Sequence, residues 1–125
     1  MSAAAIDWPV LKALALSLDL PEIIESTSWG QPNLKAFGKL WVWWSPHEDC
    51  PVFKVDFDER EHLLEHRADT FFITPHYRNH RLVLMRVHAF DADWARDNLQ
   101  RVWRTQAPKR FLKNWDAGHD AGDGT

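Results

Sequence analysis

The strict alternation of residue types from Val52 to Phe57 constrains the fold more than any other feature of the chain. Phe53, Val55 and Phe57 share one face of an extended segment, and the two residues between them are charged. A strand with one apolar face must be buried against a covering layer. Because 125 residues fall within the usual size of one domain, we expect the sheet and its cover to form a single unit.

Other segments before and after this one have the β-branched and aromatic composition of strands. Gly38-Lys39 separates two apolar stretches and can form the tight turn of a hairpin. The predicted strands are Glu25 to Trp29, the hairpin pair Asn33 to Phe37 and Leu40 to Trp44, Val52 to Phe57, and a second pair, Phe71 to Thr74 and Leu82 to His88.

Helical patterns lie at both ends of this strand-rich stretch and once within it. The predicted helices run from an Asp7 cap to about Pro21, from Asp58 to about Arg67, and from an Asp91 or Asp93 cap to Pro108. The sequence therefore predicts an α+β two-layer sandwich. Its antiparallel sheet has about five strands, and the helices from both ends pack on one face of it.

Acidic and basic residues are segregated along the chain. Residues 1–77 carry 6 Lys and Arg against 12 Asp and Glu, whereas residues 78–115 carry 9 against 3. The last ten residues hold three Asp and no basic residue, so we expect one domain over 1–115 and a disordered acidic tail over 116–125. A nearly neutral body requires any nucleic-acid binding to depend on a local basic patch.

The chain lacks the signals of a membrane or secreted protein. No apolar run approaches the ~20 residues that cross a bilayer, and because no basic region precedes Asp7 we expect no signal peptide. Cys50, the one cysteine, cannot form an internal disulfide. We expect a cytoplasmic protein, a monomer, with no membrane partner.

Most candidate chemical groups have a simpler interpretation. His62 and His66 share a helix face, but no third ligand follows at a recognisable spacing, so we expect no metal. Acidic neighbours would raise the pKa of the Cys50 thiol, which argues against a nucleophile. No catalytic residue and no cofactor can be named, and the residues favour a binding protein over an enzyme.

The aromatic run Trp41, Trp43 and Trp44 has two interpretations. Alternation places Trp41 and Trp43 on one face of their strand and Trp44 on the other, so at least one ring is expected to face away from the core. Packing against the sheet is favoured over a platform for stacking bases or another ligand, and both remain open.

Four short motifs, in this order, carry a family resemblance. They are Thr27 to Pro32, Leu34-Lys35 with Gly38-Lys39, Thr74 to Tyr77, and Trp103-Arg104 with Ala107 to Arg110. With these the chain resembles the MmcQ/YjbR-like family over about Trp8 to Lys113. The resemblance implies a two-layer α/β domain similar to frataxin, hairpins described as a double wing, and the DNA-binding label that the family often carries. Gln31 stands where the family more usually has His.

Three functions follow as hypotheses. In the first, DNA phosphates are bound by basic residues of the hairpin and the C-terminal segment, namely Lys35, Lys39, Arg78, Arg81, Lys109 and Arg110. In the second, a pocket for a small anion or metabolite, which could be enzyme-like, is built from Trp29, His76, Tyr77, Trp103 and Arg104, with Arg110 holding the anion. In the third, the aromatic hairpin is a sheet edge that binds another protein.

Overall fold

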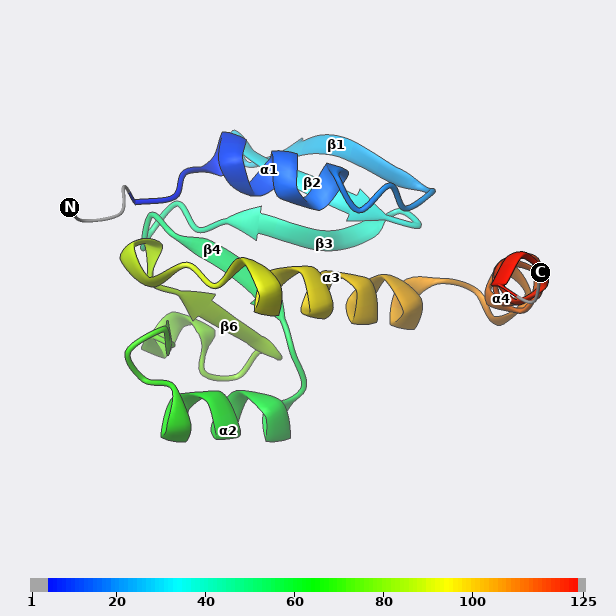
Figure 1. Cartoon of the computed structure of the whole chain (residues 1–125). Helices are drawn as coiled ribbons and strands as arrows, with labels where there is room; N and C mark the ends of the chain where they lie inside the picture. Colours follow the sequence, from blue (N-terminus) through cyan, green and yellow to red (C-terminus); the bar gives the residue numbers. More distant parts are fainter. Residues whose placement is uncertain (1–4, 124–125) are drawn as a thin grey trace.

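A six-stranded antiparallel sheet forms the centre of the molecule in the computed structural model, which describes residues 5–123 and the side chains of residues 5–118 (Figure 1). The strand order is β1-β2-β3-β4-β6-β5. The strands are β1 (Ile23–Ser28), β2 (Gln31–Ala36), β3 (Lys39–Trp44), β4 (Pro51–Lys54), β5 (Phe71–Phe72) and β6 (Leu82–Met85). The predicted α+β class with one antiparallel sheet is confirmed.

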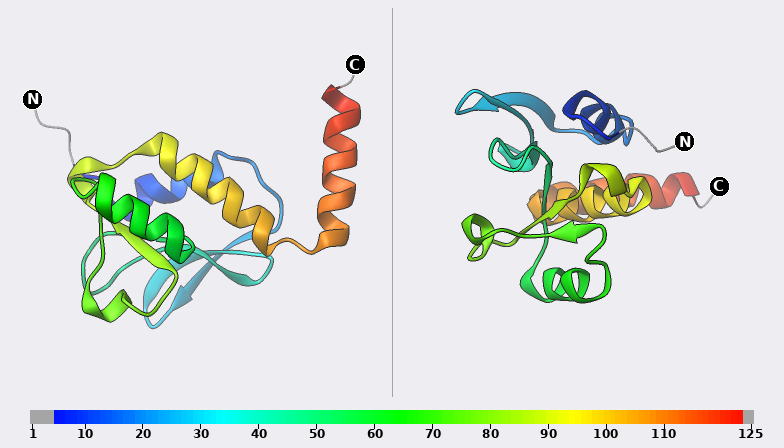
Figure 2. Two further views of the ribbon diagram at one scale, coloured as in Figure 1. Left: turned by 90° about the horizontal axis from the view of Figure 1, so that it is seen from below. Right: turned by 90° about the vertical axis from the view of Figure 1, so that its left-hand side faces the viewer.

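Four helices accompany the sheet. They are α1 (Trp8–Leu16), α2 (Phe57–His66), α3 (Ala92–Gln106) and α4 (Lys109–Asp123), with two 3₁₀ turns, η1 (Pro75–Tyr77) and η2 (Val87–Ala89). The two views of Figure 2 show α1 and α3 on the same face of the sheet, with α4 projecting from the body. No helix within the described residues is long and apolar enough to cross a membrane.

Aspartate side chains begin three of the helices. The carboxylates of Asp7 and Asp91 accept hydrogen bonds from the backbone N–H groups of Val10 and Trp94, as the sequence predicts for α1 and for one of its two candidates in α3. For α2 the predicted cap at Asp58 is wrong. Asp56 accepts from Glu59 N at 2.7 Å instead, which ends the strand at Lys54 and makes Phe57 the first residue of the helix.

Helix α4 is an element that the sequence analysis did not predict. Its first turns hold apolar side chains on one side, and the rings of Phe111 and Trp115 pack against Trp103 at 5.9 and 5.2 Å between centroids. Arg104 adds a two-pronged ion pair to Asp116 at 2.8 and 3.0 Å. The backbone is helical to Asp123, where we expected a disordered tail. The division of the chain at residue 115 stays a prediction.

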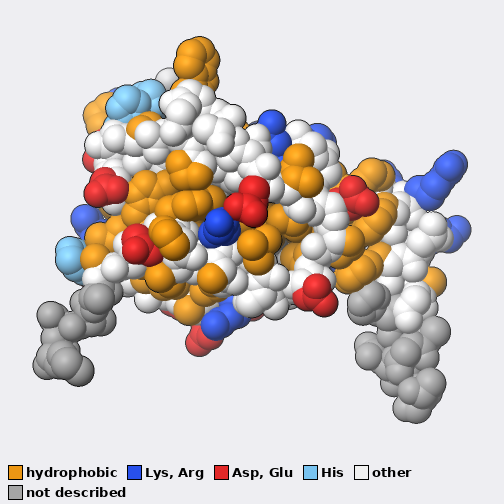
Figure 3. Space-filling model, turned by 90° about the horizontal axis from the view of Figure 1, so that it is seen from above, with side chains coloured by type: hydrophobic (Ala, Val, Ile, Leu, Met, Phe, Trp, Pro, Cys, Tyr) orange, Lys and Arg blue, Asp and Glu red, His pale blue; other side chains and the backbone are white. Residues whose placement is uncertain are grey.

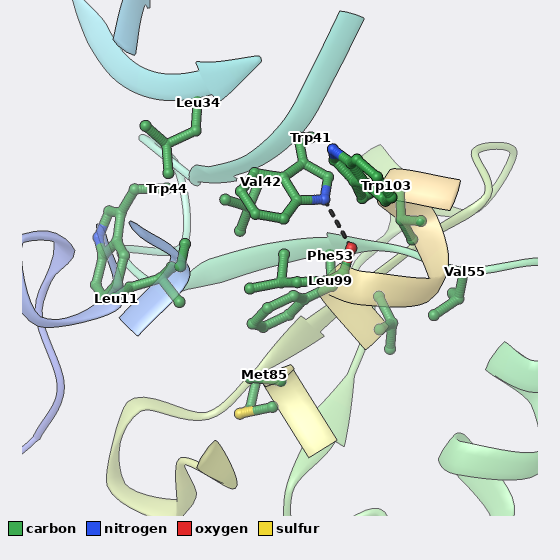
Figure 4. Packing of buried hydrophobic residues seen from close by; sticks show 14 of the residues in the cluster. Leu11, Leu34, Trp41, Val42, Trp44, Phe53, Val55, Met85, Leu99 and Trp103 are labelled. Carbon is green, nitrogen blue, oxygen red and sulfur yellow. Dashed lines mark hydrogen bonds between the residues drawn. The ribbon is translucent and has the colours of Figure 1, made fainter. Parts of the chain in front are cut away.

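The core lies between the sheet and helices α1 and α3 (Figure 4). Trp41 and Trp44 are both in it, so the prediction that they face opposite ways is wrong. The cause is a β-bulge: Leu34 pairs with Val42 and Lys35 with Leu40, which leaves Trp41 unpaired and breaks the alternation of β3. The indole N–H of Trp41 donates to Leu99 O at 2.9 Å. Of the three tryptophans of β3, Trp43 is the one on the other face of the sheet. The sequence predicts that at least one of these rings faces away from the core.

The opposite face is covered on one half only. A smaller apolar cluster of Cys50, Val52, Tyr77 and Leu84 lies there, with Trp43 packed against it. The segment from η1 to His80 covers this half. Buried Arg60 in α2 fixes it in place, because the Arg60 guanidinium donates to Tyr77 O and His80 O at 3.3 and 2.8 Å. The face of β1, β2 and β3 turned away from α1 and α3 carries no helix from residues 5–123, and we call it the open face (Figure 2).

Candidate nucleic-acid interface

A groove of about 490 Å³ lies where β4 leads into α2, beside the C-terminal half of α3. We call it the basic groove, because four of its side chains are Lys or Arg and two are carboxylates. It is lined by Lys39, Lys54, Val55, Asp56, Glu59, Arg81, Arg101, Val102, Thr105 and Gln106.

Gln106 fixes two of the basic residues in place. Its side-chain N–H donates to the backbone oxygens of Ala36 and Lys39 at 2.9 and 3.4 Å, which anchors the β2–β3 turn to the end of α3. Its oxygen accepts from Lys54 Nζ at 3.0 Å. One buried amide therefore positions both the Lys54 ammonium and the strand that begins at Lys39.

The pKa of Lys54 is lowered by its surroundings in the groove. Burial lowers the pKa of its ammonium, and the nearby positive charge of Lys39 lowers it further. Neither lysine forms an ion pair within the part of the chain whose side chains are described. Two uncompensated cations that repel each other favour the entry of an anion.

The two carboxylates of the groove already have partners. Asp56 caps α2, and Glu59 Oε1 accepts from Arg101 at 3.1 Å. Arg101 also donates to Asn98 Oδ1 at 2.8 Å, and Asn98 donates to Lys54 O. Arg81 lies over the Phe57 ring at 5.5 Å and has no ion pair among the described side chains. The groove thus presents an excess of positive charge.

The six predicted phosphate contacts do not form one surface. Lys39 and Arg81, which are far apart in the sequence, meet in the basic groove. Lys35 lies in β2 on the open face, Arg78 follows η1, and both lie outside the groove lining. Exposed Lys109 and Arg110 begin α4. The structure brings together two of the six.

The five residues predicted for a ligand pocket are dispersed. Trp103 is buried and donates its indole N–H to Pro21 O at 3.0 Å, and Arg104 pairs with Asp116. Tyr77 is buried with its hydroxyl 2.7 Å from Ser45 Oγ, and exposed His76 lies against Tyr77. Trp29 stands fully exposed in the β1–β2 turn. None of the five lines the basic groove.

The structure also bears on other candidates from the sequence. The aromatic hairpin is not a sheet edge, because β2 and β3 are inner strands and the edges are β1 and β5. Figure 3, which looks onto α1 and β1, shows hydrophobic side chains interrupted by charges of both signs. Burial, followed by Glu48 and Asp49, raises the pKa of the Cys50 thiol to about 12, as its acidic neighbours predict. Within residues 5–118, no three His, Cys, Asp or Glu side chains are placed to hold a metal ion.

Two of the four basic residues of the groove, Lys39 and Arg81, were among the site residues predicted from the sequence. Lys54, Arg101 and Gln106 were not proposed as site residues. A signal was present in α3, where Asn98, Val102 and Gln106 follow one another at intervals of four and place two amides on the buried side of the helix. Buried amides in a core-facing stripe indicate polar partners, and here those partners are the groove backbone and Lys54.

Fold and groove together define a small α+β protein with a basic groove at one end of its sheet. The model of the YjbR family matches residues 18–105, which is more than half of the chain. The chain therefore belongs to the YjbR family. The matched stretch contains every residue of the groove lining except Gln106. No curated protein and no solved structure matches the chain.

Proposed function

We propose that this protein binds DNA, with the basic groove contacting backbone phosphates. The observation that carries the proposal is the meeting of Lys39, Lys54 and Arg81 in one groove, where none of the three has a carboxylate partner among the described side chains. Phosphate oxygens are the anions that such side chains most often bind in nucleic-acid complexes.

The charge distribution supports a local mode of binding. The chain has a formal net charge of −3, so long-range attraction to DNA is weak and short contacts must supply the affinity. Burial is the main cause of the lowered pKa of Lys54 and repulsion by Lys39 is the second, and a phosphate held between the two lysines would offset that repulsion. Exposed Lys109 and Arg110 at the start of α4 are further candidate contacts.

Fluorescence anisotropy with a labelled DNA oligonucleotide at low salt tests the proposal. Lys39→Ala and Arg81→Ala should each weaken binding severalfold, and by similar factors for unrelated DNA sequences, because phosphate contacts carry no sequence information. Arg96→Ala is the matched control. It removes one positive charge from the exposed surface of α3 at a residue that does not line the groove. Equal losses in all three variants would contradict a role for the groove.

A small anionic metabolite is a second candidate ligand, favoured by the size of the groove. Its volume of about 490 Å³ lies within the ~300–1,000 Å³ typical of small-molecule sites. In that case a nucleoside monophosphate or inorganic phosphate should raise the melting temperature of the wild type and not that of Arg81→Ala. DNA should then show no binding that depends on Lys39 or Arg81.

A further inference from the structure

A second concave site lies on the open face, whereas the basic groove lies on the side of the sheet that α3 covers. It is a hollow of about 180 Å³ that shares no residue with the groove. We call it the tryptophan hollow. It is lined by Ser28, Trp29, Gln31, Pro32, Asn33, Leu40, Trp43, Trp44 and Pro46. Most of this lining is apolar or aromatic, which suits a flat ring better than an ion.

Asn33 supplies an unfilled hydrogen-bonding position in this lining. The side chain is only 2% exposed, and its amide N–H donates to Ser28 Oγ at 3.0 Å. Its oxygen Oδ1 is buried and has no partner among the described residues. Buried polar atoms in native proteins are almost always paired, so this acceptor in the lining of the hollow is a position that a donor group of a ligand would satisfy.

Trp29 occupies an unusual position beside the hollow. It and Gly30 form the two-residue turn between β1 and β2, with φ of 54° and 76°. The first position of such a turn favours Asn, Asp or Gly, and a bulky side chain there is uncommon. The Trp29 side chain is nevertheless fully exposed, at 101%. A large ring held in solvent beside an aromatic wall is available for stacking.

A positive charge lies next to the hollow on the same face. Asn33 and Lys35 are two residues apart in β2, so their side chains project from the same face roughly 7 Å apart along the strand. Lys35 pairs across the sheet with Leu40, which lines the hollow. Lys35 forms no ion pair within the described side chains. An aromatic site, a hydrogen-bond acceptor and a free cation thus follow one another on the open face.

We propose that the tryptophan hollow binds one unpaired nucleobase, whose phosphate is contacted by Lys35. The base stacks against Trp29 or Trp43, and one of its N–H groups donates to Asn33 Oδ1. A base inside a duplex cannot enter, because both of its faces are stacked and its pairing edge is occupied. This inference rests on the proposed nucleic-acid function and sharpens it, since it assigns single-stranded DNA as the preferred form.

The test compares one oligonucleotide as a single strand and as a duplex, using the full chain and anisotropy at fixed salt. The wild type should bind the single strand more tightly. Trp29→Ala should weaken single-strand binding at least about fivefold and leave duplex binding unchanged. Val10→Ala is the control, because Val10 is also an exposed apolar residue, 54% accessible, but lies on α1. Equal binding of both forms, or no effect of Trp29→Ala, would overturn the inference while the groove proposal stands.

If no oligonucleotide binds, the groove proposal is refuted, and a second measurement then tests the tryptophan hollow by itself. Deoxycytidine monophosphate is titrated while the indole N–H signals are followed by NMR. The signals of Trp29 and Trp43 should shift, and those of buried Trp41 and Trp103 should not. Lys35→Ala should reduce the saturable shift. No shift at Trp29 and Trp43, or a uniform shift of all indole signals, would overturn the inference.

Discussion

The two faces of the sheet at β3 hold their tryptophans in different ways. On the helix-covered face, Trp41 and Trp103 are 0% and 1% exposed, and each indole N–H donates to a backbone oxygen. On the open face, Trp29 is fully exposed and Trp43 is half-buried, and neither indole has a hydrogen bond among the described residues. The same residue type thus serves stability on one face and is free for a ligand on the other.

The largest expected effect comes from removing one tryptophan from each face. Trp41→Ala should lower the free energy of unfolding by about 3–5 kcal/mol, because it opens a cavity under α3 and leaves Leu99 O without its donor. Trp29→Ala should change it by less than about 0.5 kcal/mol, because the side chain is exposed. Urea denaturation of both variants measures the difference. Similar losses would show that the two faces do not divide stability from binding.

A smaller effect tests how firmly α3 is fixed over the core. A hydrogen bond from Trp94 N lowers the pKa of the Asp91 carboxyl, and Arg67 at 2.7 Å lowers it further. A lowered pKa stabilises the fold above the ordinary value near 3.8, and the contribution is lost as the pH falls through the lowered value. Asp91→Ala should therefore cost about 1 kcal/mol at pH 7 and progressively less in acid.

Asp91→Asn is the matched control for this change. Asparagine keeps the cap but removes the ion pair with Arg67 and the titration. It should lose less stability than Asp91→Ala at pH 7, as measured by denaturation between pH 3 and pH 7. An Ala variant whose deficit stays constant over that range would contradict the assigned cause.

Most helices and strands could be predicted from the sequence, because they depend on residues that are close together in the chain. Apolar, β-branched and aromatic composition indicated the strands, with alternation at Val52 to Phe57. Asp7 and Asp91 marked the helix starts through hydrogen bonds to residues three positions away. The bulge at Trp41 depends on how β2 pairs with β3, which no local pattern records. Helix α4 was missed because its stability comes from the rings of Phe111 and Trp115 against Trp103, and its composition was interpreted without that partner.

The candidate site was only partly predictable for a similar reason. Lys39 could be proposed because it lies in a hairpin motif, and Arg81 because it lies in the basic segment over residues 78–115. Lys54 appeared as one polar residue of an alternating strand, and only the structure brings it to Gln106 and beside Lys39. Trp103 and Arg104 belong to a family motif, yet their contacts are with Pro21 and Asp116. Motif residues can therefore serve the fold rather than a ligand.

The smallest expected effect on stability concerns Lys54, which lines the basic groove on the helix-covered side of the sheet. Its lowered pKa means that the charged ammonium is disfavoured in the folded state, so this penalty fades as the pH rises from the lowered value toward 10.5. The wild type should therefore gain stability relative to Lys54→Met as the pH rises from neutral toward 10.5. Melting temperatures across that range measure it, and parallel curves would show that Lys54 is not perturbed.

The salt dependence of DNA affinity tests the central claim most directly. The slope of log K against log salt concentration falls by about 0.9 for each phosphate contact that is lost with duplex DNA. The double variant Lys39→Ala/Arg81→Ala should therefore bind with a slope about 1.8 units shallower than the wild type, and Arg96→Ala should keep the wild-type slope. A double variant with the slope of the wild type would contradict the claim that the basic groove binds phosphates.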